Sequence, residues 1–208
     1  MKAFSPVGID IERVRSLLDS EGKINLTDYQ WFLIKYYAYL LYEASLKLNL
    51  VSLADRDVLV SRHIWRALSM GLHIESFPNK TILDVGSGSG IPAIPLKIYY
   101  PMSRFYLVES RRKRANFLKS VIRKLHLKEI TVINSRVEDW DDDVIADVVT
   151  ARSVANPTAL RKWVSNHVHK KSVLVCTLNR ADKVDIEGAK DVFLESGEEA
   201  MRLGIIPL

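Results

Sequence analysis

The sequence has a single cysteine, Cys176, among 208 residues, which excludes an intrachain disulfide and a zinc site built from several cysteines. It also lacks the run of about 20 apolar residues that a membrane-spanning helix needs. Lys97 interrupts the apolar stretch around Pro95, and the apolar run from Tyr36 to Tyr42 is too short to cross a membrane. No signal-peptide pattern opens the chain. We therefore expect a cytoplasmic protein with no membrane anchor and no metal.

The composition excludes further classes of protein. Hydrophobic residues make up 48% and charged residues 26% of the chain, which disfavours a collagen-like, coiled-coil or disordered protein. The 30 lysines and arginines outnumber the 25 aspartates and glutamates, and this net charge of +5 favours a polyanionic partner without identifying it. The length suits one domain with an extension.

The first part of the chain has helical patterns. Thr27 and Gln30 have the spacing of a capping box, and apolar residues then recur every three or four positions. Further helices are predicted at Ile9–Asp19 and Asp57–Leu72. We expect these helices to form an N-terminal extension over residues 1–79.

From Thr81 onward, short β-branched runs alternate with helical patterns, as in βαβ units that build a parallel sheet. The predicted strands are Thr81–Val85, Phe105–Glu109, Ile130–Ile133, Ile145–Thr150 and Ser172–Thr177. The predicted helices are Pro92–Tyr100, Arg111–Leu127, Pro157–His169 and Ile186–Glu195. The fold class is therefore α/β, with residues 80–208 forming one compact core.

A glycine-rich segment joins the first predicted strand to the next helix. It reads Asp84-Val85-Gly86-Ser87-Gly88-Ser89-Gly90-Ile91-Pro92. Glycines allow a backbone to approach a ligand closely, and the helix that follows presents unpaired N–H groups at its start. The spacing is G-x-G-x-G rather than the G-x-G-x-x-G of dinucleotide-binding enzymes, which disfavours a nicotinamide or flavin cofactor.

Glu109 ends the second predicted strand, nineteen positions after Gly90. A carboxylate at the carboxyl edge of a parallel sheet can accept both hydroxyls of a ribose. The alternative is that Glu109 caps the helix predicted to begin near Arg111. Its combination with the glycine turn favours the cofactor role.

An acidic run precedes the fourth predicted strand. It consists of Glu138, Asp139, Asp141, Asp142 and Asp143. A solvated loop is a better interpretation than a metal site, because adjacent acids in one loop seldom converge without spaced glycines.

Asp84 with its three glycines resembles motif I of the class I methyltransferases that use S-adenosylmethionine, and Glu109 matches their ribose-binding acid. More narrowly, the chain resembles the bacterial 16S rRNA guanine-N7 methyltransferases called RsmG or GidB, over roughly residues 24–178. The matching segments are Ile24 to Gln30, Asn49-Leu50, Arg62-His63-Ile64, the glycine turn with Ile91-Pro92 and Pro95-Leu96, Ser135-Arg136-Val137-Glu138, and Ala151-Arg152-Ser153-Val154. The resemblance implies a Rossmann-like methyltransferase sheet flanked by helices.

The resemblance also implies roles for individual residues. Gly86 and Ile91 match positions that line the cofactor pocket, Val137 and Glu138 match positions that meet the adenine, and Arg152 matches an arginine at the methionine end. His63 matches a histidine that is a candidate for substrate positioning, although a packed or solvated histidine is the commoner case. The full set expected to bind the cofactor is Asp84, Gly86, Ser87, Gly88, Gly90, Ile91, Glu109, Arg136, Val137, Glu138 and Arg152.

Basic residues concentrate between Arg104 and Lys128, where nine lysines and arginines accompany one acid, Glu109. A solvated helix usually mixes the signs of its charges, so a nearly uniform cationic face favours phosphate contact. The residues expected to bind RNA are Arg111, Arg112, Lys113, Lys119, Arg123 and Lys124. The expected partner is ribosomal RNA or the small subunit, bound by a monomer.

The sequence departs from the family pattern in several places. Arg66-Ala67 stands where the family has Asp-Ser, and Leu178-Asn179-Arg180 stands where it has Leu-Lys-Gly. We also expect the final antiparallel strand pair to be missing, with Arg202–Ile206 forming only its first strand. These departures leave open a non-catalytic RNA-binding or ribosome-assembly factor, and a small-molecule methyltransferase is a third hypothesis.

Overall fold

A seven-stranded mixed sheet forms the centre of the protein, in a computed structural model that describes residues 24–48, 50, 59–72, 79–179, 182, 184–196 and 199–208. The strand order is β3-β2-β1-β4-β5-β7-β6. The strands are β1 (Thr81–Val85), β2 (Arg104–Val108), β3 (Ile130–Ile133), β4 (Ala146–Ala151), β5 (Val168–Thr177), β6 (Lys190–Ser196) and β7 (Glu199–Pro207). Strands β1 to β5 are parallel, whereas β7 runs antiparallel to both β5 and β6.

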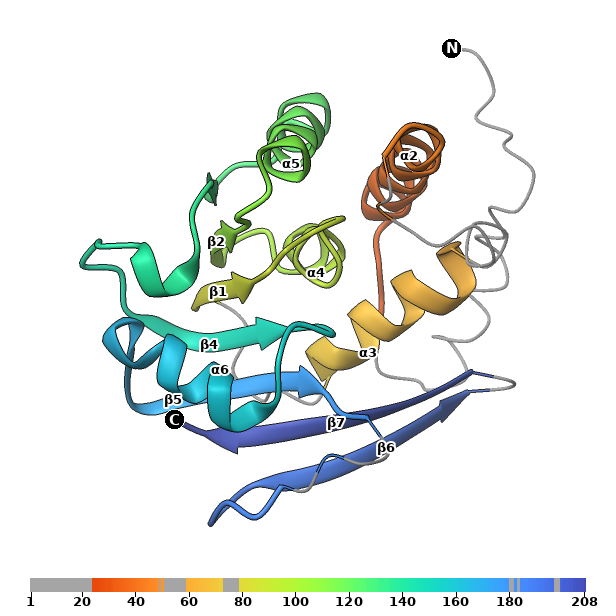
Figure 1. Ribbon diagram of the computed structural model, residues 1–208. Helices are drawn as coiled ribbons and strands as arrows, with labels where there is room; N and C mark the ends of the chain where they lie inside the picture. Colours follow the sequence, from red (N-terminus) through yellow and green to blue (C-terminus); the bar gives the residue numbers. More distant parts are fainter. Residues whose placement is uncertain are drawn as a thin grey trace.

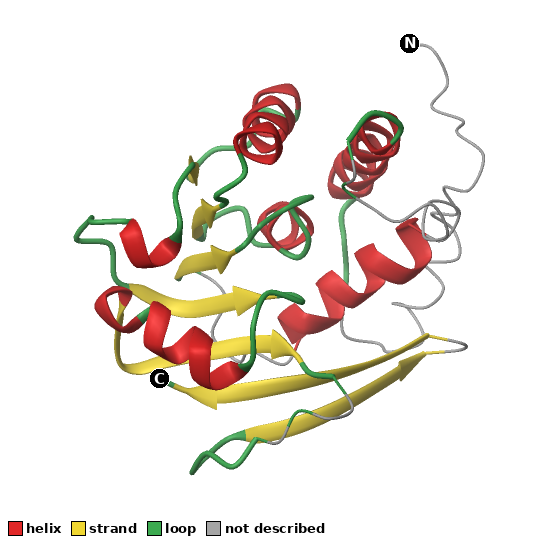
Figure 2. Ribbon diagram, in the orientation of Figure 1, coloured by secondary structure: helices red, strands yellow, loops and turns green. Residues whose placement is uncertain are grey.

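Helices cover both faces of the sheet (Figures 1 and 2). They are α2 (Asp28–Ser45), the π-helix η1 (Leu59–Ile64), α3 (Trp65–Leu72), α4 (Ala93–Tyr99), α5 (Arg112–Lys124) and α6 (Pro157–Trp163), with 3-10 turns η2 (Val137–Asp139) and η3 (Ser165–His167). Helices α2 to α5 lie on one face and α6 lies on the other (Figure 1). Of the described helices, none is long and apolar enough to cross a membrane.

Alternation along the central strands divides the apolar core into two parts. Ile82 on β1 belongs to the cluster under helices α2 to α5, whereas its neighbour Leu83 belongs to the cluster under α6. Successive side chains of a strand point to opposite faces, and both faces of this sheet are covered. This explains why β1 and β4 are buried along almost their whole length.

The predicted α/β fold class is confirmed, and four of the five predicted strands are shifted by no more than one residue at either end. The fifth, predicted at Ser172–Thr177, begins earlier, at Val168. The predicted helix at Asp57–Leu72 is instead a π-helix followed by α3 in its described part. The helix predicted at Ile9–Asp19 lies outside the described residues.

Two predictions about the C-terminal part are wrong. The segment predicted as a helix at Ile186–Glu195 contains most of β6, and the closing antiparallel pair predicted to be missing is present as β6 and β7. On β6, Val192 and Leu194 pack against the core while Phe193 between them is exposed, which is the period of a strand. Pairing with β7 decides the conformation of a segment whose local pattern is ambiguous.

Helix α2 is docked onto the core at its first turn. The predicted capping box is present, because Thr27 Oγ1 accepts from the Gln30 backbone N–H at 3.2 Å and Gln30 Oε1 accepts from the Thr27 N–H at 2.9 Å. The Gln30 amide also donates to the carbonyls of Ile98 and Tyr99 at the end of α4, at 2.8 and 3.2 Å. One side chain therefore caps α2 and satisfies carbonyls that α4 leaves without helical partners.

Arg66 joins α3 to the closing strands. Its Nη2 donates to the Ala200 carbonyl on β7 at 2.9 Å. This hydrogen bond helps to fix α3 against the antiparallel end of the sheet.

Candidate active site

The glycine turn between β1 and α4 lies at the carboxyl ends of the central strands, beside the boundary between β1 and β4. Gly86 has a φ of 66°, and a Cβ there would lie 2.7 Å from Val154 Cγ2. Gly90 has a φ of 92°, and a Cβ there would lie 2.7 Å from Ile94 and 3.0 Å from Leu118. Both positions therefore need glycine for conformation and for space.

Asp84, at the end of β1, is a buried carboxyl group with a protein partner at only one oxygen. Oδ1 accepts from Thr150 Oγ1 on β4 at 2.6 Å, whereas Oδ2 is buried and accepts no hydrogen bond from any described residue. Burial raises the pKa of Asp84 to about 6, although the Thr150 hydrogen bond and the Arg152 charge oppose this shift. Burying this oxygen without a hydrogen-bond donor costs free energy, and a cationic ligand would offset that cost.

Glu109 connects the glycine turn to the start of α5. Oε2 accepts from the Gly88 N–H at 2.8 Å, and Oε1 accepts from the Arg111 N–H at 2.7 Å. Arg111 is the N-cap residue of α5, and no side chain of a described residue caps this helix, so the contact with Glu109 fixes the entry to α5 without capping it. It does not exclude a ribose, because a carboxylate has about four acceptor positions and these contacts use two.

Asn134, just after β3, holds the loop that follows Glu109. Its amide donates to the carbonyls of Glu109 and Ser110, at 2.8 and 3.1 Å. The carboxyl ends of β2 and β3 are fixed relative to one another in this way, and both border the cavity described next.

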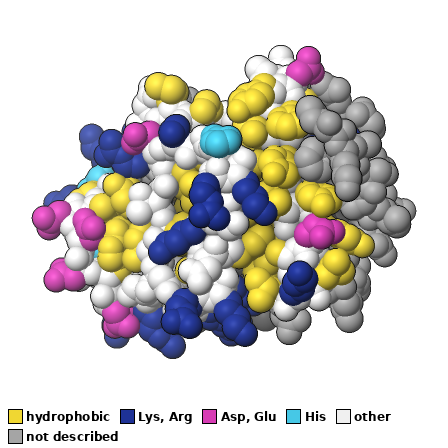
Figure 3. All heavy atoms as spheres, turned by 90° about the horizontal axis from the view of Figure 1, so that it is seen from above, with side chains coloured by type: hydrophobic (Ala, Val, Ile, Leu, Met, Phe, Trp, Pro, Cys, Tyr) yellow, Lys and Arg dark blue, Asp and Glu magenta, His cyan; other side chains and the backbone are white. Residues whose placement is uncertain are grey.

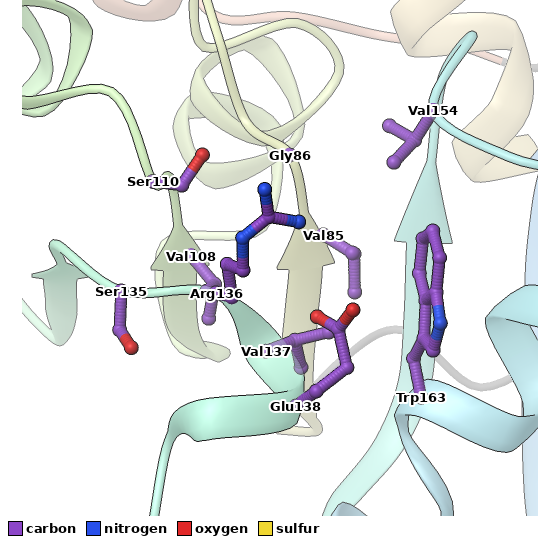
Figure 4. Close-up of a pocket in the computed structure, with 10 residues that line it drawn as sticks. All are labelled: Val85, Gly86, Val108, Ser110, Ser135, Arg136, Val137, Glu138, Val154 and Trp163. Carbon is purple, nitrogen blue, oxygen red and sulfur yellow. The ribbon is translucent and has the colours of Figure 1, made fainter.

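A cavity of about 210 Å³ opens at the carboxyl ends of β1, β2 and β4 (Figure 4). It is lined by Val85, Gly86, Val108, Ser110, Ser135, Arg136, Val137, Glu138, Val154 and Trp163. The Glu138 carboxylate and the Trp163 indole lie on opposite sides of it, and the Arg136 guanidinium extends across toward Gly86 (Figure 4). An apolar slot with a few polar groups at its edge suits a flat heterocycle.

Arg152 and His63 form a partly buried pair on the side of the turn nearest the N-terminal helices. Arg152 Nη1 lies 2.9 Å from His63 Nδ1. A guanidinium can only donate, so Nδ1 is the acceptor and a neutral His63 carries its proton on Nε2. The histidine therefore orients the arginine.

Tyr37 of α2 reaches the glycine turn from the N-terminal extension. Its hydroxyl donates to the Ser89 carbonyl at 2.8 Å, and the side chain is fully buried. Burial raises the pKa of this phenol far above its usual value. The hydroxyl therefore stays protonated and continues to donate.

The structure divides the site residues predicted from sequence into three groups. Gly86, Arg136, Val137 and Glu138 line the cavity. Asp84, Ser87, Gly88, Gly90, Ile91 and Glu109 form the buried turn beside it, and Arg152 and His63 make the separate pair. Sequence reasoning missed Thr150, Tyr37, Asn134, Ser110, Ser135, Val154 and Trp163.

Comparisons with known proteins agree with this geometry. Residues 30–204 match the rRNA small subunit methyltransferase G family, GidB. The protein named ribosomal RNA small subunit methyltransferase G of Leuconostoc citreum is 31% identical over 74% of this chain and 66% of its own length. The protein of that name from Chlorobium limicola is 33% identical over 76% of this chain and 72% of its own.

A solved structure confirms the fold. The precorrin-6y C5,15-methyltransferase of Geobacter metallireducens superposes with a TM-score of 0.55 at 15% identity, over 70% of this chain and 87% of that one. The resemblance noted in the sequence is thus confirmed, together with the prediction of a Rossmann-like methyltransferase fold. The chain belongs to the rRNA small subunit methyltransferase G family and is an S-adenosylmethionine-dependent methyltransferase.

Proposed function

We propose that this protein transfers a methyl group from S-adenosylmethionine to N7 of a guanine in small-subunit ribosomal RNA. The observation that carries the proposal is the site at the carboxyl ends of β1, β2 and β4 in a chain of this family. A doubly wound sheet binds its ligand at this edge, where the strand order reverses. Under this proposal the protein acts in the cytoplasm, where its RNA substrate is made.

The residues present fit the cofactor. Asp84 Oδ2, buried and without a hydrogen bond from the described residues, is an acceptor for a cationic group of the methionine part. Glu109 keeps acceptor capacity for the ribose, and the slot between Glu138 and Trp163 suits the adenine. The cofactor supplies an electrophilic methyl group on a sulfonium.

The protein's own contribution is alignment and electrostatics. Guanine N7 has a free lone pair at neutral pH, so the reaction needs no general base. Holding the base in line with the methyl group supplies most of the acceleration. Arg152, oriented by His63, is positioned to fix a ligand carboxylate or the base, and Asp84 and Glu138 offset positive charge on the methylated product.

A cationic surface beside the site is the proposed RNA contact. We call it the basic face, and it consists of Arg111, Arg112, Lys113, Lys119, Arg123 and Lys124 at and along α5, all of them exposed. Figure 3 looks down on the side of the molecule where α5 lies uppermost in Figure 1, and it shows lysines and arginines gathered across the middle of the surface. Such a surface binds phosphates with little regard to sequence, so it supplies affinity and orientation.

The test has two parts. Calorimetry with S-adenosylhomocysteine is expected to show saturable binding to one site, and its absence would refute the cofactor assignment. Small subunits and naked RNA from a strain that lacks the modification are then incubated with the protein and labelled S-adenosylmethionine. The label is expected in 16S rRNA, mapped to one guanine by chain cleavage at N7-methylguanosine and primer extension.

The other two hypotheses are outcomes of this test. Salt-sensitive RNA binding without methyl transfer would favour an assembly factor, a hypothesis that loses one ground now that the closing strands are present. The assembly-factor hypothesis also rests on the change of the Leu-Lys-Gly pattern at Asn179. In the structure, the Asn179 carbonyl accepts a hydrogen bond from Arg202 Nη1 at 2.8 Å. Methyl transfer to metabolites that persists when the Arg111–Arg114 cluster is neutralised would favour a small-molecule methyltransferase.

A further inference from the structure

A second cavity, of about 450 Å³, lies at the β3 edge of the sheet. We call it the edge groove. It is lined by Lys119, Ile122, Arg123, His126, Leu127, Lys128, Ile130, Thr131 and Val132. The second half of α5 and the residues after it form one wall, and β3 forms the other.

The rim of the edge groove is strongly cationic. Lys119, Arg123 and Lys128 are exposed, and no carboxylate in the described part of the chain lies within 4 Å of their charged nitrogens. The nearest acid along the chain, Glu129, is bound elsewhere, because its Oε2 accepts from Arg104 Nε at 3.1 Å. The rim therefore presents three charges that no described acidic side chain neutralises.

Below this rim, the lining of the edge groove includes four apolar side chains. Ile122, Leu127, Ile130 and Val132 are only partly buried, although each packs against the core. A cationic rim above an apolar lining matches the two parts of an unpaired nucleotide, whose phosphates need cations and whose base has an apolar face. A helix surface that only faces water would need no apolar side chains beside its charges.

We propose that the edge groove holds an unpaired nucleotide of the RNA substrate other than the guanine that is methylated. This rests on the proposed function, since it assigns a second contact to the same RNA. The first turn of α5 adjoins the cofactor turn through the Glu109 contact with Arg111, whereas the edge groove adjoins the last turn. The 13 residues of α5 span about 20 Å at 1.5 Å each, so one nucleotide cannot occupy both places.

Site-directed crosslinking tests the position of the RNA. His126 is exposed on the wall of the groove formed by the residues after α5, and His126→Cys offers a thiol for a photoreactive reagent. The native Cys176 is buried and its pKa is raised to about 12, so it stays unlabelled. Irradiation with small-subunit RNA is expected to crosslink one nucleotide in a loop or bulge, distinct from the methylated guanine.

The chemical basis is tested on both partners. An abasic substitution at the crosslinked nucleotide is expected to weaken RNA binding, whereas the same change one position away has a smaller effect. Lys119→Ala with Arg123→Ala and Lys128→Ala is expected to weaken RNA binding about tenfold and to reduce its salt dependence. The matched control, which also removes three positive charges, is Lys162→Ala with Lys170→Ala and Lys171→Ala, three exposed lysines outside the groove.

The outcomes separate this proposal from the proposed function. Unchanged RNA affinity in the triple variant, or crosslinking spread evenly over the RNA, would overturn the groove while leaving methyl transfer intact. Weakened RNA binding together with an absence of methyl transfer in the wild type would support the groove and refute the function. In a second irradiation, with whole small subunits, crosslinking to a ribosomal protein in place of RNA would overturn the RNA assignment.

Discussion

Asp84 is the residue where stability and ligand binding oppose each other. Its pKa is about 6 in the folded protein, against roughly 4 in an unfolded chain. Between these pH values the folded state binds more protons than the unfolded state, so the free energy of unfolding falls as the pH rises. Above pH 6 the buried carboxylate lowers the free energy of unfolding by its full amount, on the order of 2–3 kcal/mol.

We therefore expect Asp84→Asn to stabilise the protein without ligand at pH 8 and to bind cofactor weakly. The amide keeps an acceptor for Thr150 but carries no charge to desolvate. Thermal unfolding should show a melting temperature about 4–8 °C higher than wild type at pH 8, shrinking toward zero near pH 4. Asp141→Asn, at an exposed loop position, is the control and should change neither quantity.

His63 is expected to act through Arg152. His63 Nδ1 accepts from the Arg152 guanidinium and so holds the arginine in one orientation. We expect His63→Phe to lower kcat/KM about tenfold. His63→Asn, which keeps an acceptor oxygen for the guanidinium, should retain most of the wild-type kcat/KM. Equal losses of kcat/KM in His63→Phe and His63→Asn would argue against this role.

At the scale of elements, α2 supports the glycine turn although it supplies no residue to the cavity. It contacts the end of α4 through Gln30 and the glycine turn through Tyr37. The turn is thus held by the sheet on one side and by an N-terminal helix on the other.

Tyr37→Phe is expected to loosen the turn. It leaves the buried Ser89 carbonyl without this donor, a loss worth about 1–3 kcal/mol. We expect weaker binding of S-adenosylhomocysteine by calorimetry and a lower melting temperature. Tyr29→Phe on the exposed side of the same helix should resemble wild type, and equal effects of the two substitutions would refute the coupling.

The elements differ in how far the sequence predicted them. The βα order from Thr81 and the glycine turn were predictable, because strand period, helix period and turn chemistry agree locally there. The strand β6 was not, since Val192 to Leu194 becomes a strand only by pairing with β7. Trp163 and Tyr37 were also missed, because each reaches the site from an amphipathic helix where packing alone explains an aromatic residue.

At the scale of the whole molecule, cofactor binding and RNA binding are expected to be separable. The basic face follows α5, whereas the cavity lies among strand ends. Arg112→Glu with Lys119→Glu should weaken RNA binding at least about tenfold in a filter-binding assay and leave S-adenosylhomocysteine affinity unchanged.

Lys170→Glu with Lys171→Glu applies the same change in charge to exposed positions on β5 and should have the smaller effect. Loss of cofactor affinity and of RNA affinity to the same degree would contradict the separation. A weakening of RNA binding by the β5 pair equal to that caused by the α5 pair would show that net charge alone, rather than the basic face, determines binding.

The order of the strands also places unlike charges at the two edges of the sheet. The β3 edge lies beside the basic face, while the opposite edge and the loop before it carry Asp185, Glu187, Asp191 and Glu195 against Lys190 and Arg202, of which Arg202 pairs with Asp191. Such a separation gives an electric dipole across the sheet, on which the field of a polyanion exerts a torque. Under the proposed function, we expect this torque to turn α5 toward the RNA before contact, and added salt to slow the encounter.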